Sequence, residues 1–442
     1  RFETASELYR SAQLIWEHTE TPGNTASADC IKGLADIDYD AQRYQPALDG
    51  YQRAQDINQK ILGPDHPEIA RLWSDIARCE AALGLNTEAE THIRQAVSSL
   101  EKNVDPNSPD LALAYSIRSW VELNLNRADE ALKSNEQALT ILRKTGGNSA
   151  ALGWVMYRQG EIDRSCGRYG NAETNFKQAV SILGKYLDRD HPRVAVAFIG
   201  WGETLVAEKK YSKALPLYQK AGRIQAKAFG LEDLNVAATA YHQAEVQNIL
   251  GNYRSAEPLY YQALNIRGRW LGLDGPEVAV CRINLAEIYK VSGRDRDSRT
   301  CAETALDTAS RQADPENVLT GAVLNLLARF QIEQGDFDEA QKDLDRATAI
   351  TKRFYGPDRP EMAKCVATQA KLASARGQYK SAEALFGSSL TVLEKYYGPN
   401  HPYVGMILGD QLEWARLSGK IAIAAELSKR LQKIRSQKNG RV

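Results

Sequence analysis

Residues 63–102 read GPDHPEIARLWSDIARCEAALGLNTEAETHIRQAVSSLEK, and this segment predicts two helices. The first helix runs from about Pro67 to Leu83, and Gly84 ends it as the residue that follows the cap. Pro67 occupies the first helical position, where the missing N–H of proline is harmless. The second helix runs from about Thr87 to Lys102. We name the two helices A and B.

The same pattern returns along the chain about every 42 residues. Stepping from Ala47 at intervals of 42, with one interval of 41, gives a column of small residues: Ala5, Ala47, Ala89, Ala131, Ala172, Ala214, Ala256, Ser298, Ala340, Ala382 and Ala424. Seven positions later the residue is again Ala in the first nine repeats, from Ala12 to Ala347. Small residues at fixed positions let helix backbones approach closely, so both columns predict helix–helix contacts.

Helical pairs in tandem predict an all-α fold, a right-handed α-solenoid in which each pair buries its apolar face on its neighbours. We expect a single superhelix over 1–442, because no linker rich in Gly, Ser or Pro divides the chain. We expect residues 1–20 to form a leading helix B of a truncated repeat, 21–437 to form ten 42-residue repeats, and 438–442 to form a tail. Since Arg1 falls in a helix B, we expect the chain to be a fragment whose upstream part is missing.

Length and composition agree with such an array. At 442 residues the chain exceeds the roughly 250–300 residues at which single cores stop growing. Its 56 basic and 56 acidic residues give no net charge, whereas a nucleic-acid binder that neutralises phosphates normally has a basic surplus. No apolar run is long enough for a membrane helix. The six Cys include no CxxC pair, so we predict six free thiols and a reducing, cytoplasmic setting.

The repeat itself resembles a known one. A Gly-x-Tyr turn such as Gly167-Arg-Tyr169, Ala at the anchor column and Ala seven residues later are similar to the tetratricopeptide repeat. Its 42-residue period and its Gly-Pro-Asp-His-Pro loops resemble the variety found in kinesin light chains and many bacterial proteins. The resemblance covers nearly the whole chain and implies the fold, a role in binding proteins or peptides, and a ligand groove lined by the A helices.

No catalytic or cofactor motif accompanies the repeats. Walker A, dinucleotide-binding, HExxH, GxSxG and EF-hand patterns are all absent from the sequence. His66, His191 and His401 share one loop position, but repeats three and five apart cannot bring them to one metal ion, so we predict turn and cap roles. Cys30, Cys281 and Cys365 alternate with small apolar residues in one column and are expected to be inert. We therefore predict a protein that is not an enzyme and has no cofactor.

Groove residues follow from the resemblance. With Ala70 taken as position one of helix A, positions two, five, six and nine should face the groove. Position nine supplies Trp120 and four successive glutamates, which we name the acidic row: Glu161, Glu203, Glu245 and Glu287. The other candidate binding residues are Trp154, Tyr157, Tyr241, His242, Asn284 and Asn325. We expect the acidic row to receive a basic or amine-bearing segment, unless Arg158, Arg164 or Arg282 neutralises it.

Kinesin light chains hold acidic, Trp-containing peptides in a basic groove with Asn residues, and here the sequence departs from the family. The matching Asn is clear only at Asn284, and the central charge is negative, which argues against cargo of that kind. The main hypothesis is a non-catalytic scaffold that binds a peptide or partner protein in the groove. The alternative is a ligand-sensing arm of a larger signalling protein whose effector domain lies outside this chain. RNA recognition is disfavoured by the neutral charge.

Overall fold

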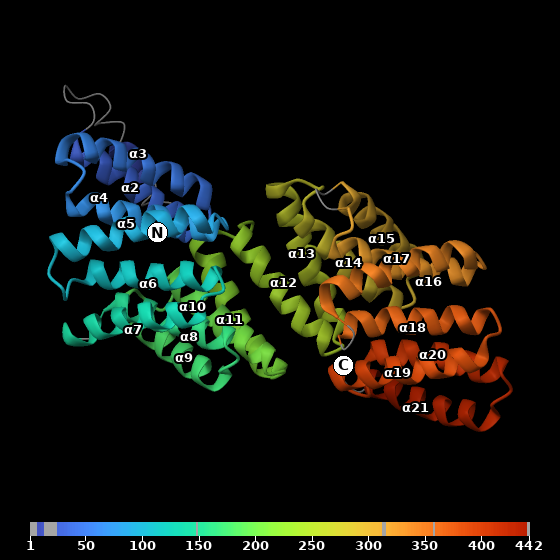
Figure 1. Ribbon diagram of the computed structural model, residues 1–442. Helices are drawn as coiled ribbons and strands as arrows, with labels where there is room; N and C mark the ends of the chain where they lie inside the picture. The colour runs from blue at the N-terminus through green and yellow to red at the C-terminus, as the bar shows by residue number, and fades with distance from the viewer. Residues whose placement is uncertain (1–6, 13–23, 147–148, 312–314, 357–358, 440–442) are drawn as a thin grey trace. The chain divides into compact units, whose positions relative to one another are not determined.

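The computed structural model describes residues 7–12, 24–146, 149–311, 315–356 and 359–439, and this part of the chain contains helices and no strand (Figure 1). The A helices are α2 (Thr25–Asp40), α4 (Pro67–Ala82), α6 (Pro109–Asn124), α8 (Ala150–Ser165), α10 (Pro192–Ala207), α12 (Leu234–Ile249), α14 (Pro276–Val291), α16 (Val318–Gln334), α18 (Pro360–Ala375) and α20 (Pro402–Leu417). The B helices are α3 (Tyr44–Leu62), α5 (Asn86–Asn103), α7 (Ala128–Lys144), α9 (Tyr169–Tyr186), α11 (Tyr211–Phe229), α13 (Tyr253–Leu271), α15 (Asp295–Ser310), α17 (Phe337–Tyr355), α19 (Tyr379–Tyr397) and α21 (Ile421–Asn439).

The all-α prediction and its repeat count are confirmed for the described residues, which contain ten A–B pairs. The helices predicted at Pro67–Leu83 and Thr87–Lys102 correspond to α4 and α5. The start of α4 is as predicted, and the other three ends differ by one residue each. Of the predicted leading helix, residues 7–12 are helical, and the rest of 1–20 lies outside the described residues. The tail at 440–442 and the loop residues 147–148 also lie outside them.

Helix ends are set by local chemistry. Gly84 adopts φ 79°, a left-handed conformation that lets the chain leave α4. Pro67 stands at the first position of α4, and the His66 side chain accepts a hydrogen bond from the Glu68 N–H, 3.2 Å away. His191 and His401 accept the same N-cap bond from Arg193 and Tyr403, at 3.2 and 3.1 Å. The predicted cap role of the three histidines is confirmed.

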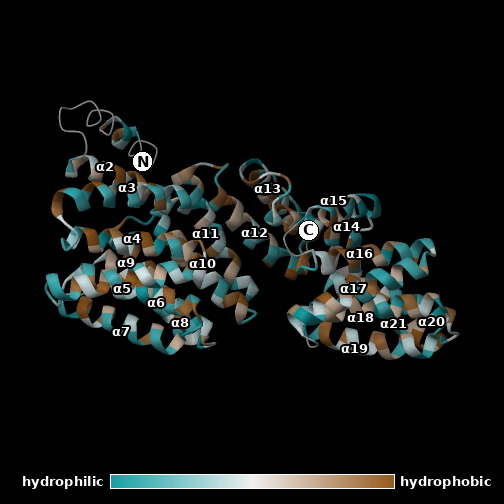
Figure 2. Ribbon diagram, turned by 45° about the horizontal axis from the view of Figure 1, so that its top comes forward, coloured by the Kyte–Doolittle hydropathy of each residue, from teal (hydrophilic) through white to brown (hydrophobic). Residues whose placement is uncertain are grey.

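The small residues of both columns are buried where helices meet, from Ala47 to Ala382 in one column and from Ala54 to Ala347 in the other. Each Ala of the anchor column from Ala47 to Ala382 has no exposed surface, and Ser298 is equally buried. Ser298 tolerates this position because its hydroxyl donates to the Ala286 carbonyl oxygen at 2.7 Å. The helices carry apolar and polar residues together, as Figure 2 shows. A B helix such as α17 buries one face, whereas an A helix such as α16 is buried on most sides.

The chain falls into two compact units, one ending at Thr239 and the other beginning at Ala240. The division lies within α12. In the first unit α4 contacts α6, α6 contacts α8 and α8 contacts α10, so the A helices form a continuous row. In the second unit α14, α16, α18 and α20 form the equivalent row. Whether one superhelix runs through both units stays a prediction.

Within each unit, the A row curves until its fifth helix touches its first. In the first unit, Arg193 at the start of α10 is ion-paired with Asp40 at the end of α2, with Nε and Oδ1 3.1 Å apart. In the second, the His401 Nε2–H at the start of α20 donates to the Asn248 carbonyl oxygen of α12 at 3.1 Å. We name these two the closure contacts. Because curvature brings the A helices together from opposite sides, side chains of non-adjacent repeats share one inner face in each unit.

Close helix packing gives a first prediction. A Cβ on Gly202 of α10 would lie 2.7 Å from Cε1 of Tyr218, so Gly202→Ala overpacks the α10–α11 contact. We expect a loss of about 1–3 kcal/mol in the free energy of unfolding, measured by urea denaturation. The control is Gly387→Ala in α19, where nothing lies within 4 Å and the substitution should instead stabilise by about 0.5–1 kcal/mol. Equal effects of the two changes would contradict this packing.

The closure contact at His401 gives a second prediction. Burial lowers the pKa of His401 from its usual 6.5 to about 4, so the folded ring stays neutral, with Nδ1 accepting and Nε2 donating. The neutral His401 ring therefore makes its full contribution to the free energy of unfolding above pH 6.5. That contribution is lost as the pH falls toward 4, because the ring is protonated in the unfolded chain before it is protonated in the folded one. We expect a loss on the order of 2 kcal/mol between pH 7 and pH 5. His401→Asn keeps an N-cap acceptor without a titrating ring and should flatten this part of the urea-midpoint profile; an unchanged slope would exclude His401 as the cause.

Candidate functional site

In the first unit, the predicted residues Trp120, Trp154 and Tyr157 gather around Arg158. Trp154 and Tyr157 of α8 stack with ring centroids 4.8 Å apart and planes 21° from parallel. The guanidinium carbon of Arg158 lies 4.4 Å from the ring centroid of Trp120 on α6, 5.4 Å from that of Tyr157 and 6.0 Å from that of Trp154. Both tryptophans are only partly buried, so their rings form a half-open aromatic surface beside a cation.

Arginines from three A helices converge on this region. Arg193 of α10 places its guanidinium carbon 5.8 Å from the Trp154 ring centroid, and Arg78 of α4 lies 3.9 Å from the ring centroid of Tyr39 on α2. Burial raises the pKa of Tyr39, and the positive charges of Arg78, Arg158 and Arg193 oppose that shift. Helices α2, α4, α8 and α10 therefore meet at one inner face, which no local pattern in the sequence encodes.

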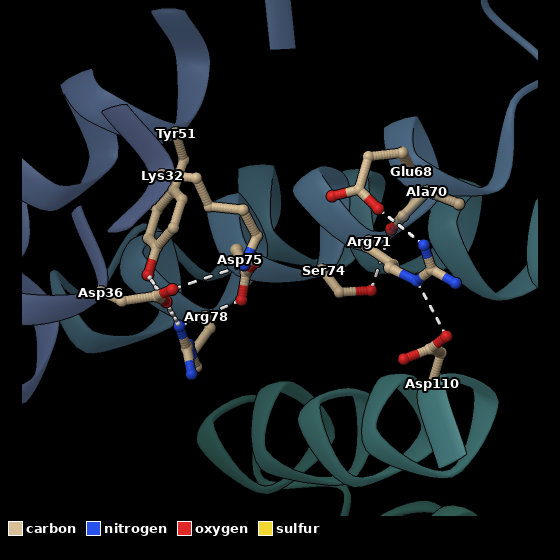
Figure 3. A network of polar contacts seen from close by, with 10 residues as sticks. All are labelled: Lys32, Asp36, Tyr51, Glu68, Ala70, Arg71, Ser74, Asp75, Arg78 and Asp110. Carbon is tan, nitrogen blue, oxygen red and sulfur yellow. Dashed lines mark hydrogen bonds and ion pairs between the residues drawn. The ribbon is translucent and has the colours of Figure 1, made fainter. Parts of the chain in front are cut away.

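A neighbouring polar network is electrically balanced (Figure 3). Arg78 Nη2 lies 3.0 Å from a carboxylate oxygen of Asp75 and 3.5 Å from one of Asp36, and Lys32 Nζ lies 3.4 Å from Asp36 and 3.6 Å from Asp75. The Tyr51 hydroxyl donates to Asp36 at 2.6 Å. Two cations thus face two carboxylates across α2 and α4, and this part of the inner face holds its own charges in place.

The acidic row divides between the units. Glu161 and Glu203 in the first unit share one cation, with Arg164 Nη2 3.4 Å from a carboxylate oxygen of each. Of the three possible neutralisers, Arg164 does this, while Arg158 contacts the aromatic rings and Arg282 donates to the Leu273 carbonyl oxygen at 2.9 Å.

In the second unit, Glu287 is held by a cation that was not among the predicted neutralisers. Lys364 Nζ of α18 donates to both Glu287 carboxylate oxygens, at 2.6 and 2.8 Å, and lies 4.9 Å from the Tyr403 ring centroid. A small pocket beside this pair has room for about one water molecule and is lined by Asn248, Tyr253, Glu287, Val291, Tyr397, His401 and Tyr403. Glu287 therefore belongs to an internal ion pair.

The remaining predicted residues of the second unit form one cluster and one outlier. Asn284 donates to the Tyr241 hydroxyl at 3.2 Å, and His242 Nδ1 lies 3.6 Å from a carboxylate oxygen of Glu245. Arg267 places its guanidinium carbon 4.7 Å from the Tyr241 ring centroid. Asn325 of α16 is 7% exposed, and its side-chain oxygen is buried without a hydrogen-bond partner among the described residues. Tyr241, His242, Glu245 and Asn284 are thus brought together.

Histidines and cysteines form no metal site in the described part of the chain. These residues contain no group of three or more His, Cys, Asp or Glu that could hold a metal ion. All six cysteines are described, and they are free thiols. Cys281 and Cys365 are buried as predicted, whereas Cys30 is partly exposed, and burial raises the pKa of Cys365 to about 11.

Over the described ranges, no helix is both long and apolar enough to cross a membrane.

Arg158 was predicted only as a possible neutraliser of the acidic row, although its position in helix A also predicts a place in the groove. Arg158 occupies position six of helix A, the position that also holds His242 and Asn284, and that column places it beside Trp154 and Tyr157. Lys364 occupies position two, which also faces the groove, but nothing local pairs it with Glu287, 77 residues away. Arg193 left no signal, because it precedes position one and its partner Asp40 is 153 residues away.

The sequence model of the family described as "Tetratricopeptide repeat" matches residues 24–102, 68–144, 151–227, 235–311 and 319–395. Protein KINESIN LIGHT CHAIN-RELATED 2 of Arabidopsis thaliana is 22% identical over 231 residues, which are 52% of this chain and 34% of that protein. The chain thus spans about a third of the length of this curated relative.

Two solved structures resemble most of the chain. The apo form of the quorum sensor NprR from B. thuringiensis has a TM-score of 0.55 and 13% identity, covering 81% of this chain and 99% of that one. A Rap protein complexed with Competence and Sporulation Factor has a TM-score of 0.55 and 15% identity, covering 84% and 99%. At these identities the likenesses show the fold, an α-solenoid of helical pairs.

The ion pair of Glu287 gives a third prediction. Lys364→Met leaves the Glu287 carboxylate, whose side chain is 22% exposed, without its cation. We expect a loss on the order of 3–5 kcal/mol in the free energy of unfolding, largely relieved when Glu287→Gln is added, as measured by a double-mutant cycle in urea. Lys342→Met removes a lysine whose side chain is 74% exposed and serves as the control, with no measurable change expected. If the changes in the free energy of unfolding caused by Lys364→Met and Glu287→Gln simply add in the double variant, the pairing is refuted.

Proposed function

The chain belongs to the tetratricopeptide repeat family, with similarity to kinesin light chain-related proteins, and on that premise we propose that it is a non-catalytic scaffold that binds an extended peptide segment of a partner protein. In the first unit the segment contacts Trp120, Trp154, Tyr157, Glu161 and Glu203 on the inner face. The second unit has candidate contacts of its own for such a segment: Tyr241, His242, Glu245 and Asn284. The proposal places the protein in the cytoplasm and requires no cofactor.

The proposal that the ligand is basic rests on one observation. Arg164 lies 3.4 Å from both Glu161 and Glu203, so a single guanidinium serves two carboxylates on adjacent A helices. The side chains of Arg164 and Glu203 are each 33% exposed, which leaves them within reach of a ligand. A Lys or Arg side chain of the ligand contacts the exposed part of the Glu203 carboxylate, and the Tyr157–Trp154 stack offers an aromatic face.

Aromatic rings and arginine side by side are the residues that dominate binding energy in protein interfaces. Trp120, Trp154, Tyr157 and Arg158 meet this description, and they come from two A helices that the repeat architecture holds rigidly. Glu287 and Asn325 drop out of the proposed contacts, because Lys364 engages Glu287 and Asn325 is buried. The alternative role, as the sensing arm of a larger protein, uses the same face and differs only in the response to a bound ligand.

The test of this proposal is a charge reversal on the inner face. A phage-displayed library of random linear decapeptides is selected on the wild-type chain, and binding of the selected peptides is measured by fluorescence polarisation. The double variant Glu203→Lys/Glu245→Lys should weaken binding at least about tenfold while the melting temperature stays nearly unchanged. The matched control, Glu136→Lys/Glu303→Lys, makes the same charge change at exposed positions of α7 and α15 and should bind normally. Equal binding by the inner-face variant, or equal loss in the control, rejects the proposal.

A further inference from the structure

Helix α11 differs from the other B helices in the charge of its exposed face. Four exposed cations run along it, and we name them the basic stripe: Lys213, Lys220, Arg223 and Lys227. Seven residues make nearly two helical turns, so Lys213, Lys220 and Lys227 lie on one side of the helix, and Arg223 lies beside the last two. The stripe is about 21 Å long. Helix α11 contains no acidic residue.

The repeat pattern does not require these charges. The position of Lys227 is basic in every B helix from α3 to α19, because a cation near the last turn interacts favourably with the helix dipole. The other three positions are basic together only in α11. Their equivalents in α9 are Asn171, Gln178 and Ser181. Like charges three and four residues apart destabilise a helix, so the stripe does not serve to stabilise α11.

Two carboxylates border the stripe, one near each end. Lys227 is ion-paired with Asp190 in the loop that joins α9 to α10. Near the other end, Glu173 of α9 lies 3.8 Å from Lys210 and also interacts with the charge of Lys213. Because the equivalent positions of α9 are uncharged, the positive surface is about one helix wide.

The middle of the stripe faces solvent. The Lys220 Nζ lies 5.5 Å from the ring centroid of Phe198, and Arg223 has no ion pair among the described residues. Pro216 lies between Lys213 and Lys220 on the same face and is also exposed. The stripe therefore offers a ligand both positive charge and a small apolar surface.

We propose that the basic stripe binds an acidic α-helix of a partner protein, which lies along α11. This surface belongs to a B helix, so the inference does not depend on the peptide site proposed for the inner face. Acidic residues seven apart on a straight helix are separated by about 10.5 Å, as are Lys213, Lys220 and Lys227, so each carboxylate can meet one lysine. Exposed ion pairs are individually weak, and several in register set partner choice and the rate of association.

The width of the stripe favours a single helix over a broader polyanion. A nucleic-acid duplex or an anionic bilayer would also bring negative charge close to Asp190 and Glu173 at the two ends. An α-helix with its side chains is about 10–12 Å across, which matches the face of one helix. The zero net charge of the chain agrees with a partner recognised by a local charge pattern.

The first measurement uses a designed helix as the probe. A stapled, alanine-rich peptide of about three heptads carries Glu at every seventh position and one further Glu to match Arg223. Its binding to the chain is measured by fluorescence polarisation at low salt. We expect the affinity to fall at least about tenfold in Lys213→Gln/Lys220→Gln/Arg223→Gln, and binding to the wild type to weaken as the salt concentration rises.

A matched variant controls for total charge. Arg53→Gln/Lys60→Gln/Lys133→Gln removes three exposed cations from α3 and α7 and should bind the acidic helix as the wild type does. The melting temperature of the stripe variant should equal or exceed that of the wild type, because like charges have been separated. A melting temperature clearly below that of the control variant would show that the stripe stabilises the fold, and would overturn the proposal.

Two further probes decide what kind of partner the stripe binds. An unstapled peptide with the same glutamates and a proline in each heptad cannot form the helix and should bind at least about tenfold more weakly. A DNA duplex of similar length should bind more weakly than the acidic helix.

Four results overturn the proposal: no binding of the acidic helix to the wild type, equal loss of binding in the control variant, equal binding of the proline-containing peptide, or a preference for the duplex. None of them bears on the inner-face proposal, which is tested with other variants, Glu203→Lys/Glu245→Lys, on the A helices.

Discussion

Close approach of helices at the small-residue columns is the constraint on which the rest of the structure depends. Ala47 and its equivalents have no exposed surface, and Gly160 and Gly202 leave space for Phe176 and Tyr218. With larger residues the A and B helices of a repeat would separate, and the row of A helices would lose its spacing. The inner face exists because that spacing is kept from repeat to repeat.

Curvature then decides which charges meet. The two closure contacts, Asp40–Arg193 and Asn248–His401, each join residues 153 positions apart, so each unit turns through the same number of repeats before its A row meets itself. Charged side chains on the inner face are largely removed from solvent, and buried charges need partners. Most of them have one within the chain. The side chains of Arg164 and Glu203 are paired yet each 33% exposed, and the binding proposal rests on that exposure.

The features that recur in every repeat could be predicted from the sequence. The period located the ten helical pairs, and the Gly84 turn, the Pro67 start and the histidine caps follow from short-range rules that the structure confirms. The columns also singled out Trp154, Tyr157 and Glu161, of which the first two stack and the third lies one turn along the same helix from Tyr157. They could not predict that Lys364 neutralises Glu287, because that contact depends on how far the A row curves over two repeats. Curvature is a sum of small packing angles and has no signature at any single residue.

Photo-cross-linking tests the central claim, that ligands bind the inner face of the A helices, most directly. A selected decapeptide carrying one benzophenone side chain would be irradiated with the wild-type chain, and the adducts would be located by peptide mass spectrometry. The account predicts adducts in the first unit within α6, α8 and α10, residues 109–124, 150–165 and 192–207. Adducts concentrated on the B helices α7 and α9, residues 128–144 and 169–186, would contradict it.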